Sequence, residues 1–367
     1  MRNGFQWGDA RRIRMATLTR SQHNSTLNME RDRVPTTHVP IQTSPQNREN
    51  QVMVPRILFG ARGLGSATFS AVSSALGAGF LGLDSSNLPR FFNENAVGAA
   101  ISSCTIGRCE DKQKKGRETS QDSDENYDRN DCNSSKENHD DRDYEELYVQ
   151  TKFVPLRLQD SQARYSEHGS IKDQVFESHE QSEYSLIFRC QPGATRAAVG
   201  NRDLEDNENE EELRQCWMAM EALWASGAVK TLGIASSRPI SPRLLDSIYR
   251  NAEVKPSIIQ TVCRAKDGWD KALRSYCENR GILYQAVSLV RVNSYLLEDR
   301  DVLAIAQRHN TTSAQILIRF GMELGIIPVV ITPVHSRMEE ILDTLSFKLD
   351  ETEVKAIENI AELYDYE

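Results

Sequence analysis

The sequence lacks several features that would point to particular classes of protein. No apolar run approaches the roughly 18 residues that span a bilayer, so we expect no membrane partner. The seven cysteines form no framework, and this odd number over 367 residues suits a reducing compartment. Lys and Arg number 44 against 53 Asp and Glu, giving a net charge of -9. Because nucleic-acid phosphates repel such a chain, we expect no nucleic-acid partner.

Residues 1–52 lack helical or strand periodicity and are predicted to form a disordered leader. The first 28 residues contain many arginines and little acid, which is typical of an organellar transit peptide, although their amphipathic spacing is poor. We favour a leader of no structural role, or a start at Met15 or Met29, over a transit peptide. We therefore expect a cytoplasmic protein, with organellar targeting as the alternative.

A second segment, at about 103–145, is predicted to be a disordered acidic insert. From Cys109 to Asp143 it has almost no aliphatic side chains and many charges, so burial cannot offset the entropy of ordering. Three cysteines and a histidine in or beside it match no zinc spacing, and we predict no metal site. They are Cys104, Cys109, Cys132 and His139.

The rest of the chain alternates short β-like runs with helical patterns. Eight such units in series predict parallel strands joined by right-handed crossovers. Eight units over residues 53–367, interrupted by the acidic insert, favour an α/β fold closed into a (β/α)8 TIM barrel. The strand-like runs lie at 56–60, 81–86, 146–153, 184–190, 229–236, 256–262, 282–288 and 326–332.

In such a barrel the functional residues lie at the carboxyl ends of the strands. The residues at these ends are Asp84, Lys152, Cys190, Ala235, Ser236, Gln260, Val287 and Thr332. The set includes a carboxylate, an ammonium and an amide on otherwise apolar strands, and buried polar groups of this kind need partners.

The order of five segments along the chain resembles the aldo/keto reductases. These segments are "GFLGLDSS", "VQTKF", "MEALWASGAVKTLGIAS", "ILYQAVS" and "IIPVVITPVHSRMEEIL". A subgroup of the family carries DTACQPKHYxE, QTKFTPLxGQD and GTTSxxHM, with which "DSSNLPRFFNE", "QTKFVPLRLQD" and "VITPVHSRM" align without gaps. The resemblance covers about residues 53 to 365 outside the insert. It implies a (β/α)8 barrel that binds NADPH and reduces a small carbonyl compound.

The family's catalytic groups are an Asp, a Tyr, a Lys and a His. The Tyr protonates the nascent alkoxide, the Lys lowers the phenol pKa, the Asp holds the Lys and the His orients the carbonyl. The resemblance places the Asp at Asp84 and the Lys at Lys152.

The other two catalytic positions depart from the family pattern. The Tyr position falls on Phe92 if Pro89 anchors the alignment, or on Phe91 if "NE" at 93–94 does. The His position falls on Cys190, or on Arg189 after a shift of one residue.

The cofactor positions implied by the resemblance are also altered. The pair that holds the nicotinamide amide falls on Ala235 and Ser236, and the accompanying Gln is retained as Gln260. The aromatic residue that stacks on the nicotinamide is replaced by Val287. Thr332 and Arg337 match the family's adenosine-phosphate contacts, and Arg suits bidentate phosphate binding.

Two functions follow as alternatives. The first is NADPH-linked reduction of a small aldehyde or ketone, weakened or lost because the Tyr and His are replaced. The second is a non-catalytic barrel, a pseudoenzyme that binds a nucleotide or regulates a partner. For either, the resemblance implies a monomer or a simple dimer.

Overall fold

The computed structural model describes residues 38–41, 52–104, 147–154, 170–180, 185–189, 202–236, 240 and 242–363. All of them belong to one compact unit, Pro35–Glu367. Most of the predicted leader and nearly all of the predicted insert lie outside the described residues, as does Cys190.

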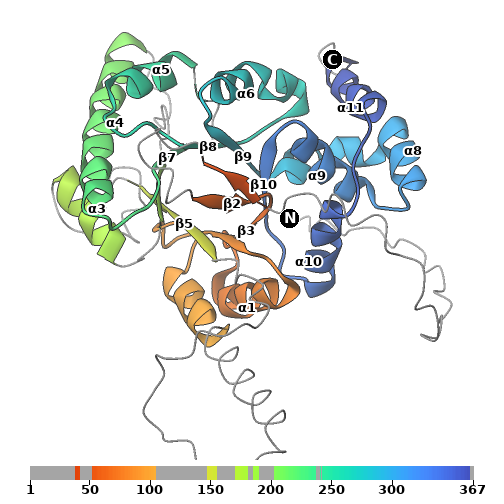
Figure 1. The fold of residues 1–367 in the computed structure, drawn as a ribbon, viewed down its shortest axis with the longest axis horizontal. Coiled ribbons are helices and arrows are strands. Elements are labelled where there is room, and N and C mark those ends of the chain that lie inside the picture. The colour runs from red at the N-terminus through yellow and green to blue at the C-terminus, as the bar shows by residue number, and fades with distance from the viewer. Residues whose placement is uncertain are drawn as a thin grey trace, which may run out of the picture. The chain divides into compact units, whose positions relative to one another are not determined.

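Eight parallel strands close into a barrel (Figure 1). Each strand pairs in parallel with the next along the chain, and the last pairs with both the first and the seventh. This confirms the fold predicted from the eight repeated units. In chain order the strands are β3 (Leu58–Gly60), β4 (Gly82–Asp84), β5 (Tyr148–Phe153), β6 (Ser185–Arg189), β7 (Gly233–Ala235), β8 (Ile258–Thr261), β9 (Leu283–Val287) and β10 (Ile326–Val330).

Helices surround the strands (Figure 1). Gly79, with φ of 111°, ends α1 in the left-handed region that glycine adopts without strain, and a Thr312–Gln315 capping box starts α9. The helices are α1 (Thr68–Ala78), one over 94–104, α3 (Ile171–Glu180), α4 (Arg202–Ala225), α5 (Pro242–Asn251), α6 (Lys271–Glu278), α7 (Leu289–Val292), α8 (Arg300–Arg308), α9 (Ser313–Glu323), α10 (His335–Leu342) and α11 (Glu351–Leu363).

A two-stranded antiparallel sheet precedes the barrel, and part of it lies in the segment predicted as a leader. It consists of β1 (His38–Pro40) and β2 (Met53–Pro55). Buried Ile41 and Val54 pack with Tyr148 and Ile258, which begin their barrel strands. The small sheet therefore contributes its apolar side chains to the amino-terminal end of the barrel. Residues 38–41 form structure because this contact removes Ile41 fully from solvent.

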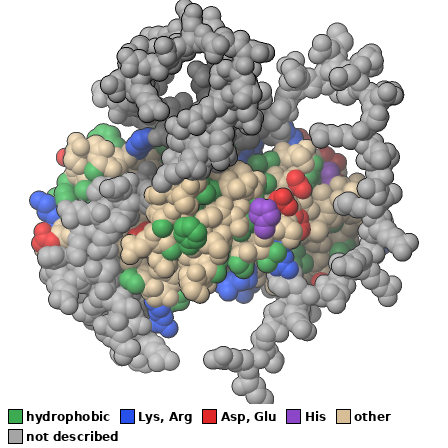
Figure 2. All heavy atoms as spheres, turned by 90° about the horizontal axis from the view of Figure 1, so that it is seen from below, with side chains coloured by type: hydrophobic (Ala, Val, Ile, Leu, Met, Phe, Trp, Pro, Cys, Tyr) green, Lys and Arg blue, Asp and Glu red, His purple; other side chains and the backbone are tan. Residues whose placement is uncertain are grey.

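The main core lies between the strands and the surrounding helices, in one cluster built on α4–α9 and another built on α1 and the helix over 94–104. On the face shown in Figure 2, described hydrophobic side chains are scattered between polar ones, as is normal for a folded surface. Within the described residues, no helix combines the length and the apolar character needed to cross a membrane.

Candidate active site

A buried ion pair lies at the carboxyl ends of β4 and β5. Lys152 Nζ donates to Asp84 Oδ1 at 2.5 Å, and each side chain is 5% exposed. The parallel register of the two strands brings these positions to the same end of the barrel. Taking two charges out of water is costly, so such a pair needs further hydrogen bonds around it.

Two amides supply hydrogen bonds to the Asp84 carboxylate. Its Oδ1 accepts from Gln150 Nε2 at 2.6 Å and from Gln260 Nε2 at 2.9 Å. Gln285 Oε1 accepts from the same two nitrogen atoms, at 2.8 and 3.1 Å, and Gln285 Nε2 returns a bond to Gln150 Oε1 at 3.0 Å. The inside of the barrel thus holds a connected polar network beneath Lys152, with Asp84 as its anion.

Alternation along β5 explains how this network is assembled. Tyr148, Gln150 and Lys152 lie two residues apart and share the inward face of the strand. The Tyr148 hydroxyl donates to Gln150 Oε1 at 3.0 Å. Burial raises the pKa of Tyr148 well above its usual value, and the Asp84 charge raises it further, so this phenol stays a donor. Sequence reasoning missed Gln150 and Gln285, although the polar alternation in "YVQTKF" was a signal for the first.

The loop after β4 brings two phenylalanine rings to different places. Lys152 Nζ lies 5.5 Å from the centre of the Phe92 ring. The neighbouring Phe91 ring instead contacts Arg62, whose Cζ lies 4.9 Å from its centre, and Arg90, whose Cζ lies 5.3 Å away. Of the two phenylalanines considered for the Tyr position, the one beside Lys152 is therefore Phe92. It is buried and carries no hydroxyl.

Backbone hydrogen bonds fix this loop against β5. Ser85 N donates to Gln150 O at 2.9 Å, and Asn87 N donates to Lys152 O at 3.1 Å. The Asn87 side chain accepts from Val154 N at 3.2 Å. Because the loop continues the strand pairing in this way, the position of Phe92 over Lys152 is set by the backbone.

Glu94 lies behind the same strand. Its carboxylate accepts from the Thr151 hydroxyl, and Thr151 alternates with Lys152 on β5 and so points to the opposite face. Burial raises the pKa of Glu94, while the Thr151 bond and the Lys152 charge partly oppose this. Glu94 therefore connects the helix over 94–104 to the strand that carries Lys152.

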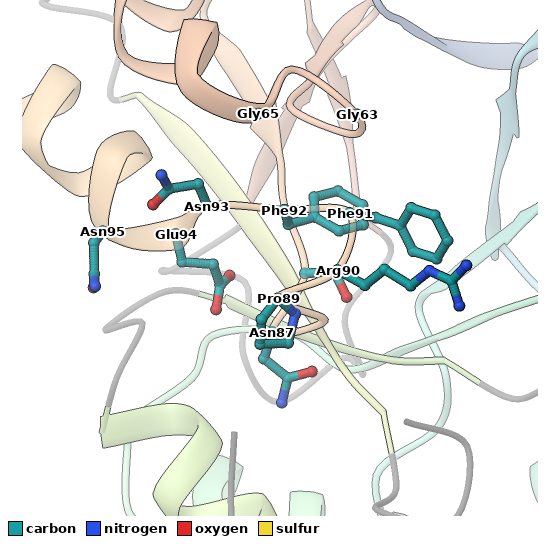
Figure 3. Close-up of a pocket in the computed structure, with 11 residues that line it drawn as sticks. Gly63, Gly65, Asn87, Pro89, Arg90, Phe91, Phe92, Asn93, Glu94 and Asn95 are labelled. Atoms are coloured by element: carbon teal, nitrogen blue, oxygen red, sulfur yellow. The ribbon is translucent and has the colours of Figure 1, made fainter. Parts of the chain in front are cut away.

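A cavity of about 450 Å³ lies beside the loop (Figure 3). Its lining consists of Gly63, Gly65 and residues 86–87 and 89–95. Phe92 lines this cavity and also neighbours Lys152, whereas Asp84 and Lys152 are not part of the lining.

The predicted nicotinamide-side residues lie at the carboxyl ends of β7, β8 and β9. Ser236 and Gln260 are buried, and the Ser236 backbone N–H donates to Gln260 O at 2.8 Å. Gln260 directs Nε2 into the network, while its Oε1 accepts no bond from any described residue, which fits an acceptor for a carboxamide N–H. Val287 is half-buried and offers apolar contact only.

The predicted phosphate-side residues lie around the start of α10. Thr332 is buried and its Oγ1 accepts from Val334 N at 3.2 Å, which shapes the turn into the helix. Arg337 lies exposed on the first turns of α10. A cation beside a helix N-terminus fits a phosphate group. Among the described residues, no group of three His, Cys, Asp or Glu side chains could hold a metal ion.

Comparison with known proteins identifies the family to which this barrel belongs. The sequence pattern of the Aldo/keto reductase family matches residues 140–362. This match spans more than half of the chain, and the chain belongs to the aldo/keto reductase family.

Individual relatives are more distant. The chain is 25% identical over 148 residues to glyoxal reductase of Bacillus subtilis, a match covering 40% of this chain and 52% of the relative. It is 29% identical over 164 residues to aldo-keto reductase family 1 member A1 of Rattus norvegicus, covering 42% and 49%. The chain thus matches about half the length of these curated relatives.

Solved structures share the fold at lower identity. An aldo/keto reductase from Brucella melitensis superposes with a TM-score of 0.59 at 20% identity, covering 84% of this chain and 96% of that one. A mutant of Gox0644 in complex with NADPH superposes with a TM-score of 0.59 at 19% identity, covering 85% and 91%.

Proposed function

We propose that this protein binds NADPH and a small carbonyl compound at the carboxyl end of its barrel, and that its reductase turnover is weakened or lost. The observation that carries the proposal is the Phe92 ring 5.5 Å from Lys152 Nζ, while Lys152 keeps its 2.5 Å bond to Asp84. An ion pair of the kind that the resemblance implies is present, and the Phe92 side chain beside it cannot donate a proton.

Bound NADPH would supply the hydride, and the protein would supply position and field. Ser236 and Gln260 Oε1 would hold the nicotinamide amide, and Thr332 with Arg337 would hold the adenosine phosphate. In a reductase with a Tyr at position 92, the Lys152 charge would lower the phenol pKa and make proton donation to the alkoxide easier. With Phe92 this step has no donor, and losing general acid catalysis costs roughly a hundred- to ten-thousandfold in rate.

Cys190, or Arg189 under the alternative alignment, stands at the position of the family's His and would not replace the contact to the carbonyl oxygen. We further propose that the protein is cytoplasmic and acts as a monomer or a simple dimer. We propose no nucleic-acid or membrane partner. The second candidate is a pseudoenzyme that senses a nucleotide. The same Phe92 geometry favours it if NADPH binds without turnover.

The test measures NADPH binding by its fluorescence and turnover of an activated aldehyde, using the full chain. We expect saturable NADPH binding and slow turnover, with Phe92→Tyr raising the rate by about a hundredfold. Phe92→Tyr combined with Cys190→His should raise it further. Phe91→Tyr is the matched control. Because the Phe91 ring contacts Arg62 and Arg90 and Lys152 contacts the Phe92 ring, this variant should leave the rate unchanged.

Each alternative has its own outcome. Absence of saturable NADPH binding would overturn the proposal. Brisk turnover by the natural chain would show that another group donates the proton. Binding without turnover in all three variants would favour the nucleotide sensor.

A further inference from the structure

Gln285 lies on β9 inside the barrel and is fully buried. Its Oε1 accepts from Gln150 Nε2 at 2.8 Å and from Gln260 Nε2 at 3.1 Å. Its Nε2 donates to Gln150 Oε1 at 3.0 Å. A buried amide is costly unless its polar atoms are paired, and both ends of the Gln285 amide are used here.

The orientation of these amides follows from the Asp84 carboxylate. Paired with Lys152 at 2.5 Å, this carboxylate can only accept hydrogen bonds. Gln150 and Gln260 therefore present their nitrogen atoms to Oδ1, at 2.6 and 2.9 Å. The Gln150 oxygen then faces Gln285 Nε2, which leaves the Gln285 oxygen as an acceptor. Reversing any one of the three amides would bring two acceptors or two donors together.

The consequence falls on Gln260, at the carboxyl end of β8. Its nitrogen carries two hydrogens and has two acceptors, Asp84 Oδ1 and Gln285 Oε1. Its oxygen accepts from no described residue and is the end of the amide left for a ligand. Asp84 alone would engage one of the two hydrogens, and Gln285 engages the second.

We propose that Gln285 is a positioning residue, which holds both Gln260 N–H groups inside the barrel and so makes the site select a pyridine ring with a carboxamide over one with a carboxylate. A carboxamide N–H donates to the Gln260 oxygen, whereas a carboxylate places a second acceptor against it. Without Gln285, one Gln260 N–H is released and can turn toward a carboxylate. The choice of ligand rests on the proposed function, whereas the orientation of Gln260 does not.

The test compares NADP⁺ with nicotinic acid adenine dinucleotide phosphate, which differ only in this group. Each is titrated calorimetrically into the full chain. We expect the natural chain to bind NADP⁺ about tenfold more tightly, because one hydrogen bond is exchanged for an acceptor–acceptor contact. Gln285→Leu should bring the two affinities close to equal. Tyr284→Phe is the matched control, because it removes a hydrogen bond from the same strand, to Asp270 at 2.8 Å, and should leave the preference unchanged.

Gln285→Glu separates positioning from packing. A protonated carboxyl group offers one donor and one acceptor, as the amide does, whereas the ionised form only accepts. Because burial raises the pKa of such a carboxyl group, the preference should be present near pH 5.5 and absent near pH 8.5. Tyr148, Asp84 and Lys152 face the same interior in the natural chain, which is therefore the reference at each pH.

A measurement without cofactor separates this inference from the proposed function. Hydrogen exchange of the Gln260 side-chain amide, followed by NMR, should show two slow hydrogens in the natural chain and only one in Gln285→Leu. That result in a protein that binds neither dinucleotide would support the positioning of Gln260 and reject the choice of ligand. Rapid exchange of both hydrogens in the natural chain would overturn the positioning. So would a preference that survives in Gln285→Leu, or one that does not change with pH in Gln285→Glu.

Discussion

Asp84 Oδ1 and Lys152 Nζ lie 2.5 Å apart in a barrel interior that leaves each side chain 5% exposed. The same Asp84 oxygen accepts hydrogen bonds from Gln150 and Gln260. The carboxylate is therefore the shared acceptor of one ammonium and two amides, and the polar network inside the barrel depends on it.

Replacing that carboxylate should destabilise the fold. In Asp84→Asn the Lys152 ammonium is buried without its counter-charge, and breaking a buried pair in this way costs about 3–5 kcal/mol. Urea unfolding measures the loss. The double variant Asp84→Asn with Lys152→Met should recover part of the stability, because the unpaired charge is gone. A single variant as stable as the natural chain would contradict the burial of the pair.

Glu94 should make stability depend on pH in an unusual direction for a carboxylate. Its folded pKa is raised by burial, so the folded state binds the proton more tightly than the unfolded state. Protonated Glu94 therefore contributes to the free energy of unfolding at low pH. This contribution is lost as the pH rises from about 4.3, the pKa of Glu in the unfolded chain, through the higher pKa in the folded chain. Glu94→Gln removes the effect, so its unfolding free energy relative to the natural chain should increase from pH 4 to pH 7. A constant difference across this range would contradict the prediction.

The buried cysteines should resist alkylation. Burial raises the pKa of Cys263 and of Cys277 to about 12, and the thiolate is the reactive form. At pH 8, iodoacetamide should modify the half-buried Cys104 well before Cys216, Cys263 or Cys277. Mass spectrometry of peptides resolves each position, and the same reaction in urea is the control. Rapid modification of Cys263 in the folded chain would contradict its burial and indicate local opening of the segment that follows β8.

Gly82 should be intolerant of a methyl group. A Cβ atom there would lie 2.3 Å from Leu58 Cδ2 and 3.1 Å from Pro55 Cγ, where the small sheet packs against the barrel. We expect Gly82→Ala to lower the unfolding free energy by about 1–3 kcal/mol, as overpacking does. Gly77→Ala is the matched control, because nothing lies within 4 Å of its Cβ position in α1 and it should stabilise by about 0.5–1 kcal/mol. Thermal unfolding of both variants decides the comparison, and equal effects would contradict the tight contact.

Much of the barrel could be predicted from local patterns. Eight strand-like runs separated by helical ones predicted eight parallel strands, because hydrophobic period is a local property. Asp84, Lys152, Gln260 and Val287 lie at strand ends as expected. The part played by residues 38–41 was not predictable, because three-residue β1 forms only where the barrel offers it an apolar surface.

The contacts inside the mouth required the tertiary structure. Phe91 and Phe92 are alike in sequence, and only the bonds between the loop and β5 place Phe92 beside Lys152 and Phe91 between arginines. Gln150 and Gln285 are 135 residues apart along the chain and become hydrogen-bonded because barrel closure brings β5 and β9 to a common interior.

The sequence by itself determined the strand order, the strand ends and the absence of a hydroxyl at positions 91 and 92, since these follow from residue type and period. Which side chains share the buried interior, and which of two adjacent phenylalanines lies beside Lys152, was decided by the tertiary structure. The physical reason is that long-range packing, and not local pattern, sets the distance between charges on different strands and loops.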